Sequence, residues 1–178
     1  MSPRLSAEEC WRRLAACSHG VLGTLHPVRG VDAVPVVYAV CEPEGAAWGG
    51  ARQIVVPIDT VKPKSPAVLQ RVANLRADPR CVLLVEHYDE DWSALWWVRL
   101  HATARLVGPD DTADEGGSES PASGELAGLR QLLAARFPAY SPPGSVVAAI
   151  VLGPGAEVDH AGRPGPPAQQ AALGWSAR

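Results

Sequence analysis

The sequence lacks the features that define several common classes of protein. No stretch approaches the ~20 consecutive apolar residues that span a bilayer. The opening segment MSPRLSAEECW has no apolar run after its arginine, so we expect no signal peptide. A net charge of −3 gives no general attraction to nucleic acid. We therefore expect a cytoplasmic protein that binds neither membranes nor nucleic acid.

Cysteine pairs and the common nucleotide motifs are also missing. The four cysteines form no C-x-x-C pair and no zinc spacing, so we interpret them as reduced residues packed as small hydrophobes. Glu86, His87, Asp89 and Asp91 fit a strand end and a solvated turn better than a metal site, and we predict no metal. The absence of G-x-G-x-x-G, Walker and G-x-S-x-G motifs removes the commonest nucleotide-binding and hydrolase signatures.

The residues that are present indicate one mainly β domain. A capping box from Ser6 to Glu9 predicts a first helix over about 6–17. Two more helices are expected, one with Ser65 as N-cap and Pro66 at its first position, the other around 126–133. Runs rich in apolar and β-branched residues predict strands at 20–25, 33–40, 53–58, 81–88, 95–107 and 146–153.

These elements show no repeated alternation of strand and helix, which favours a small antiparallel barrel over a doubly wound sheet. We assign residues 1–154 to a single domain with a flexible acidic loop at about 108–124. Residues 155–178 form a tail rich in Pro, Gly and Ala that we expect to be loose unless it packs on a partner. Pro35 cannot donate a ladder hydrogen bond, so it should lie at a sheet edge or a bulge.

The segment VKPKSP at 61–66 is the clearest candidate for a binding site. If Ser65 begins a helix, Lys62 and Lys64 lie beside the free N–H groups of its first turn. N–H donors, a hydroxyl and ammonium groups are what proteins use to hold phosphate. A solvated turn is the alternative, and the residues alone leave both interpretations open.

Four segments carry a resemblance to a known family: AVPVVYAV, IVVPIDTVKPKS, NLRADPRCVLLV and DWSALWWVRLHATARLV. Together they resemble the split β-barrel flavin and deazaflavin oxidoreductases related to pyridoxamine phosphate oxidase, and within them the F420-dependent actinobacterial branch. The resemblance covers most of residues 10–107 in order. It implies a six-stranded antiparallel split β-barrel of the FMN-binding type with peripheral helices, forming a homodimer with its cofactor sites at the interface.

The resemblance also implies where the cofactor lies. Its phosphate would contact Lys64 and Ser65, with Lys62 as a second contact to phosphate or to the acidic tail of F420. Its ring would lie along Pro35, Val36 and Val37, opposite the backbone of Ile58, Asp59 and Thr60. Arg71 is a further cation that could help neutralise the tail. Trp97 is a candidate to line the pocket, although Trp96 faces the other way and is an equal candidate.

The implied activity is hydride delivery from reduced F420 to a conjugated, electrophilic small molecule. FMN is the alternative cofactor, and a non-catalytic carrier of flavin, F420 or haem is the alternative class. No catalytic acid or base is assigned, and Tyr38 and His101 are the candidate proton donors. Many relatives have an RK-x-x-NL step, whereas here nine residues lie between Lys64 and Asn74. Residues 46–53 also look like an insertion, from which Arg52 either reaches the site or is solvated.

Overall fold

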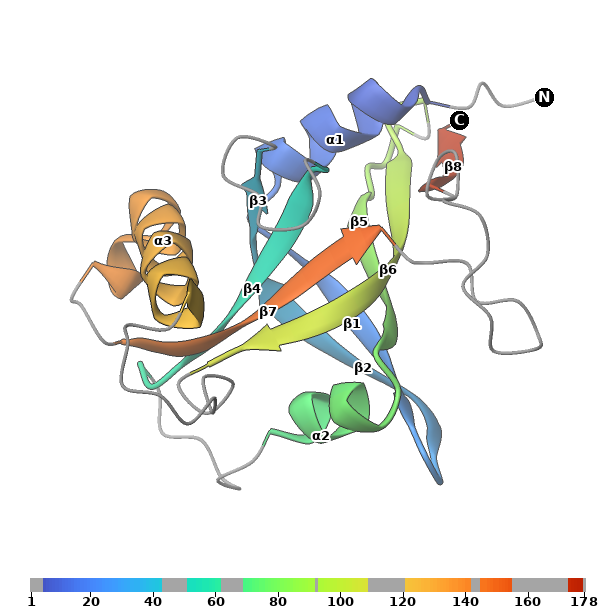
Figure 1. The fold of residues 1–178 in the computed structure, drawn as a ribbon. Coiled ribbons are helices and arrows are strands. Elements are labelled where there is room, and N and C mark those ends of the chain that lie inside the picture. Colours follow the sequence, from blue (N-terminus) through green and yellow to red (C-terminus); the bar gives the residue numbers. More distant parts are fainter. Residues whose placement is uncertain are drawn as a thin grey trace.

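The computed structural model describes residues 5–42, 51–61, 69–91, 93–108, 121–141, 145–154 and 173–177. Lys62, Lys64 and Ser65 lie outside these ranges. In the described chain, the helices and strands follow one another in the order α1 (Ala7–Ala16), β1 (His19–His26), β2 (Gly30–Val37), β3 (Ala39–Cys41), β4 (Gln53–Asp59), α2 (Gln70–Ala77), β5 (Arg80–His87), β6 (Trp96–Val107), α3 (Pro121–Arg136), the 3-10 helix η3 (Pro138–Tyr140), β7 (Val146–Pro154) and β8 (Leu173–Ala177) (Figure 1).

The strands form one antiparallel sheet in the order β2-β1-β5-β6-β7-β4-β3. Only Tyr38 separates β2 from β3 along the chain, although these strands stand at opposite ends of the sheet. The sheet must therefore curl until its two ends meet, and β2 does lie against β4. No hydrogen-bonded ladder joins these two ends within the described residues, so the sheet is not closed.

The prediction of a mainly antiparallel β fold with three helices is confirmed, but the prediction of six strands is wrong. The predicted strand at 33–40 divides at Tyr38 into β2 and β3. The tail adds β8, which pairs with β6 at Trp96–Leu100, while β7 pairs with β6 at Ala102–Val107. The end of the tail thus continues along the edge of β6 from the point where β7 stops.

Pro35 and Pro57 lie within strands at positions where a ladder partner is missing. Pro35 is in β2, the edge strand, as predicted. Pro57 is in β4, but β3 pairs only with Gln53–Val55 of that strand. Pro57 is therefore paired only on the β7 side, opposite Ala149. Because proline has no N–H to donate, both residues leave the facing edges of β2 and β4 poor in hydrogen-bond donors.

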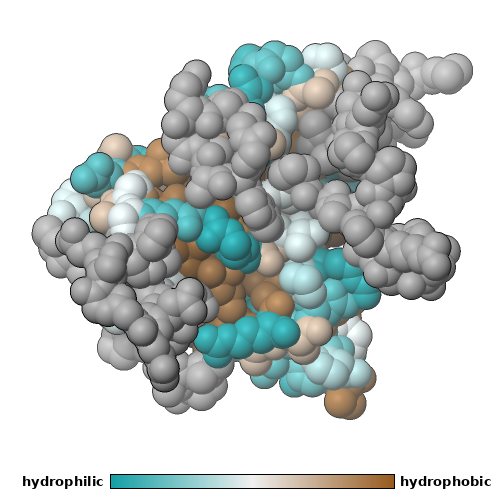
Figure 2. All heavy atoms as spheres, viewed as in Figure 1, coloured by the Kyte–Doolittle hydropathy of each residue, from teal (hydrophilic) through white to brown (hydrophobic). Residues whose placement is uncertain are grey.

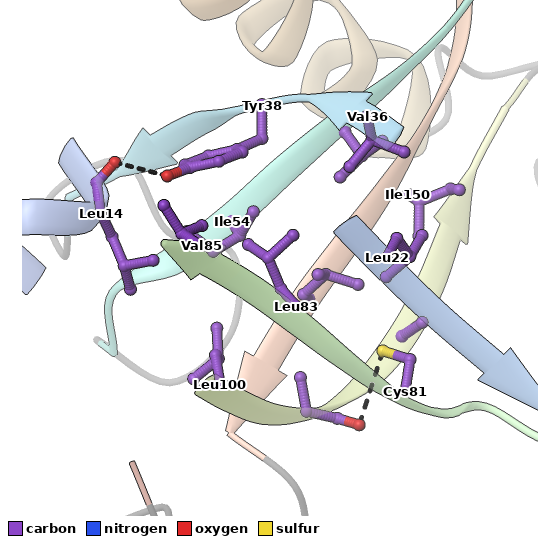
Figure 3. Packing of buried hydrophobic residues seen from close by; sticks show 14 of the residues in the cluster. Leu14, Leu22, Val36, Tyr38, Ile54, Cys81, Leu83, Val85, Leu100 and Ile150 are labelled. Carbon is purple, nitrogen blue, oxygen red and sulfur yellow. Dashed lines mark hydrogen bonds between the residues drawn. The ribbon is translucent and has the colours of Figure 1, made fainter. Parts of the chain in front are cut away.

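The main core fills the inside of the curled sheet, and α1 closes one end of it. The Tyr38 hydroxyl donates to the Leu14 carbonyl oxygen at 2.8 Å and so ties the β2–β3 junction to α1 (Figure 3). A second cluster lies outside the sheet, where α3 packs on β3, β4 and β7. The outer face of β1, β2 and β5 carries no such cover in the described chain.

The sequence predicts N-cap residues for two helices, Ser6 and Ser65, and the two predictions have different outcomes. Ser6 is the N-cap of α1 and accepts from the Glu9 N–H at 3.2 Å, as predicted. The Glu9 carboxylate instead pairs with Arg12 and Arg13. The predicted helix start at Ser65 is wrong for α2, which begins at Gln70 with Leu69 at the N-cap position and no side-chain cap. Packing of its buried residues, rather than a capping signal, determines where α2 begins.

Candidate functional site

A cavity of about 210 Å³ lies where the two ends of the sheet approach each other. Its walls come from β2, β4 and the first turn of α2, and its lining residues are Pro35, Val36, Val37, Val56, Pro57, Asp59 and Arg71. The cavity exists because β2 and β4 meet without pairing, and the two prolines in its wall have no N–H with which to form a ladder. The cavity thus lies at the split in the sheet.

This cavity brings together several residues that the resemblance assigned to the cofactor ring. Pro35, Val36 and Val37 form one wall, and Asp59 lies at the end of the opposite strand. Ile58 is partly buried against the main core. The Thr60 N–H donates to the Ser145 carbonyl oxygen at 2.9 Å, which holds the chain that leads from β4 towards residues 62–65.

Arg71 is a lining residue of the cavity that the resemblance named only as a further cation for the cofactor tail. It is the second residue of α2, and it lines the cavity. Its Nε atom is buried and has no hydrogen-bond partner among the described residues. Burial lowers the pKa of the guanidinium, and the charges of Asp59 and Tyr140 partly offset that shift. The group stays protonated, because arginine is not deprotonated in proteins, and a buried cation with an unused donor is suited to an anion.

The sequence did contain a signal for Arg71. It stands three residues before Asn74, which is the spacing between the second basic residue and Asn in the RK-x-x-NL step of the relatives. The departure from the family pattern arises only when the spacing is counted from Lys64. In this chain the step has the form Q-R-x-x-N-L, and its arginine lies on α2 rather than before it.

Asp59 is the acidic residue among those that line the cavity. Its Oδ1 accepts from the Val61 N–H at 3.1 Å, and the Tyr140 hydroxyl donates to its Oδ2 at 3.4 Å. Burial and the neighbouring Asp59 carboxylate raise the pKa of Tyr140. The cavity therefore has a lining of mixed polarity, in which Pro and Val residues lie beside one cationic group and a fixed carboxylate.

The other predicted residues lie elsewhere. Tyr38 is wholly buried in the core with its hydroxyl bound to Leu14, and it is not among the residues that line the cavity between β2 and β4. Burial also raises the pKa of Tyr38. His101 lines a different cavity, of about 510 Å³, on the outer face of β1, β2, β5 and β6. Trp97 lies on that same outer side of β6, with the Arg99 guanidinium 5.0 Å from its ring centroid.

Two further candidates are taken up by local contacts. Arg52 pairs with Glu8 at 2.7 Å and with Glu42 at 2.9 Å, so it joins α1 to the β3–β4 connection. Trp96 lies under the Arg13 guanidinium and is stacked with His87. Neither of these two side chains lines the cavity between β2 and β4.

Within the described ranges, no three His, Cys, Asp or Glu residues are grouped as metal ligands would be. The helices described there are also too short or too polar to cross a membrane.

Comparison with known proteins rests on structure, because no family model and no curated protein matches this chain. A conserved hypothetical protein from Mycobacterium tuberculosis aligns with a TM-score of 0.56 at 20% identity, over 83% of this chain and 79% of that one. A FAD-binding protein from Mesorhizobium loti aligns with a TM-score of 0.53 at 14% identity, over 85% and 91%. A haem-binding protein from Mycobacterium smegmatis gives 0.52 at 24% identity, over 84% of this chain but 52% of that protein.

These likenesses define the class of fold. The chain shares its architecture with solved structures of flavin-binding and haem-binding proteins, and the expected resemblance is confirmed at the level of fold. Fold alone does not fix function, so the activity has to be argued from the cavity.

Proposed function

We propose that this protein is an oxidoreductase that holds a flavin-type cofactor in the cavity between β2 and β4, and that the cofactor is F420. The observation that carries the proposal is the buried, unpartnered Nε of Arg71 beside the wall formed by Pro35, Val36 and Val37. Those three residues are the ones that the resemblance assigns to the ring, and Arg71 supplies the cation that a phosphate requires.

The residues fit such a cofactor in a simple division of roles. The ring would lie against Pro35–Val37 and the backbone of residues 58–60, while Arg71 would bind the phosphate. Lys62, Lys64 and Ser65 follow the end of β4 by only a few residues. We propose them as further contacts to phosphate and to the acidic tail, since several carboxylates call for more than one cation.

When bound, reduced F420 supplies a hydride, and a conjugated, electrophilic small molecule is the proposed acceptor. The chain's own residues would bind, orient and exclude water. The Val and Pro residues of the cavity would lie against the ring, and Asp59 is held in place by Val61 and Tyr140. No lining residue is assigned as an acid, so we propose that solvent supplies the proton.

FMN is the second candidate cofactor, and the fold shared with a FAD-binding protein supports it. FMN has one phosphate and no acidic tail, so Arg71 alone would neutralise much of its charge. A haem carrier fits the cavity less well. Haem iron takes an axial His, Cys, Met or Tyr, and the lining residues are only Pro, Val, Asp and Arg.

We also propose that the protein is a homodimer that buries the outer face of β1 and β2. Val21, Leu25, Val28 and Val31 are exposed there, and Figure 2 shows a hydrophobic group at the tip of the β1–β2 hairpin, at the lower right. Apolar patches of this kind mark interfaces. Side chains alternate along a strand, so Val31 and Pro35 share one face of β2. A second copy on this face would therefore adjoin the cavity.

The proposal is tested by titrating the purified protein with F420 and with FMN separately, followed by cofactor fluorescence. Turnover is then measured with the reduced cofactor and a conjugated ketone such as cyclohexenone. Binding of F420 with turnover is the expected result. Binding without turnover of any conjugated acceptor would favour a carrier, tighter binding of FMN would replace F420, and binding of neither would contradict the proposal.

A further inference from the structure

Asn74 forms a buried polar link between α2 and the β1–β2 hairpin. Its side chain is 0% exposed. The amide nitrogen donates to Thr24 Oγ1 at 3.0 Å and to Asp32 Oδ2 at 2.9 Å. The amide oxygen accepts from Gln70 Nε2 at 2.9 Å. Both donors and the oxygen are therefore used, which satisfies the polar atoms of this buried side chain.

The helix that carries Asn74 has little else to fix its position. α2 has eight residues and no side-chain N-cap hydrogen bond, and so short a helix is marginal without tertiary contacts. Its other buried residues are Val72 and Leu75. Apolar packing is not directional. Two hydrogen bonds from one amide group, by contrast, fix both the rotation of α2 about its own axis and its position relative to the β1–β2 hairpin.

The partners of Asn74 make the link a strong one. Asp32 also accepts from Arg29 at 2.9 Å, and it is the Asn74 hydrogen bond first, then Arg29, that lowers the pKa of Asp32. The acceptor is thus an ionised carboxylate, and hydrogen bonds to charged groups are roughly twice as strong as neutral ones. Asp32 stands on β2, three residues before Pro35, where the cavity wall begins.

We propose that Asn74 is a positioning residue, which holds α2 so that the Arg71 guanidinium points into the cavity. One and the same strand, β2, carries the Asn74 anchor at Asp32 and the cavity wall at Pro35–Val37. The hydrogen bonds of Asn74 therefore set the place of Arg71 relative to that wall. This inference rests on the proposed function, because it concerns the binding of an anionic cofactor by Arg71.

A double-mutant cycle tests the inference, with F420 and FMN as the probes. Asn74→Ala removes the link but leaves an alanine that favours helix. In the otherwise unchanged protein, we expect Asn74→Ala to weaken binding of the cofactor at least fivefold. In the Arg71→Ala background the same substitution should have no further effect, because Asn74 acts only through Arg71. Arg76→Ala, on the exposed side of α2, is the control and should leave binding unchanged in both backgrounds.

Thr24→Val is a milder second variant that removes one acceptor and keeps the shape of the side chain, and it should weaken binding in the same direction. Affinities are taken per folded molecule, with unfolding measured separately by urea. If the effects of Asn74→Ala and Arg71→Ala add, or if Asn74→Ala and Thr24→Val lower stability without changing affinity, the positioning role is wrong and the proposed function stands. If the wild-type protein binds neither probe, both fail.

Discussion

Arg71 shows how one residue can define what a cavity binds. The other described lining groups are apolar or, in Asp59, negative, so within the described part of the chain the positive charge of the lining comes from this guanidinium. In the sequence, Lys62 and Lys64 are the more conspicuous cations because a proline lies beside each. The Nε atom of Arg71 is buried, and burial is a property that a string of residues does not display.

At Gly20, the strands β1 and β5 approach too closely for any side chain. A Cβ there would lie 2.7 Å from the Leu84 carbonyl oxygen and 2.8 Å from Val85 Cγ2. We expect Gly20→Ala to lower the free energy of unfolding by about 1–3 kcal/mol, the usual cost of overpacking. Gly23→Ala in the same strand is the control, since its nearest neighbour would be 3.7 Å away. Equal urea midpoints for the two variants would contradict this packing.

The Tyr38 hydroxyl satisfies one of the carbonyl groups left free at the end of α1. Tyr38→Phe should therefore lower the free energy of unfolding by about 1–2 kcal/mol, because the buried Leu14 carbonyl loses its donor. Tyr88→Phe removes the hydroxyl of an exposed tyrosine and should have no effect. Urea unfolding measures both. A loss of turnover with unchanged stability in Tyr38→Phe would instead restore Tyr38 as a proton donor.

At the scale of the element, α1 makes stability depend on pH. Hydrogen bonds from Arg12 and then Arg13 lower the pKa of Glu9 from 4.5 to about 2. A lowered pKa in the folded state means that the stabilisation is complete above pH 4.5 and is lost as the pH falls towards 2. Glu9→Gln should lack this part of the acid slope when urea midpoints are compared between pH 6 and pH 2. An identical slope in both proteins would contradict the ion-pair network.

The strands and α1 could be predicted because their signals are local. Side-chain alternation marks β1, β5 and β6, and the hydroxyl of Ser6 marks the start of α1. The break at Tyr38 could not be predicted, because AVPVVYAV is one apolar run with no turn residue at the point of division. The start of α2 was also missed. Ser65-Pro66 is a good local start signal, but the buried contacts of Asn74 place the helix farther along the chain.

The lining of the cavity was predicted in part on both strands, but not on α2. The resemblance identified Pro35, Val36 and Val37, and the structure places them together with Asp59. It could not identify Arg71 as a lining residue, since that depends on how α2 sits on β1 and β2. The pairing of β8 with β6 was likewise unpredictable, because the sequence Leu173–Ala177 has no strand pattern of its own and depends on a free edge of β6.

At the scale of the whole molecule, the uncovered face of β1 and β2 predicts self-association. Val31 is 72% exposed on this face, and Val31→Asp would place a charge in an interface that excludes water. We expect the wild-type protein to sediment as a dimer and Val31→Asp as a monomer, with weaker cofactor binding. Val147→Asp, on β7, is the control and should remain dimeric. A monomeric wild-type protein at micromolar concentration would contradict the proposed interface.

The most direct test of the account is the affinity of the Arg71→Ala variant for F420 and for FMN, measured beside Lys64→Ala and Arg76→Ala by cofactor fluorescence. Loss of one charge-assisted contact should weaken binding ten- to a hundredfold, or about 1.5–3 kcal/mol. We predict this loss for Arg71→Ala, a smaller loss for Lys64→Ala and none for Arg76→Ala. If Arg71→Ala binds the cofactor as tightly as the wild-type protein does, the cavity between β2 and β4 is not the cofactor site.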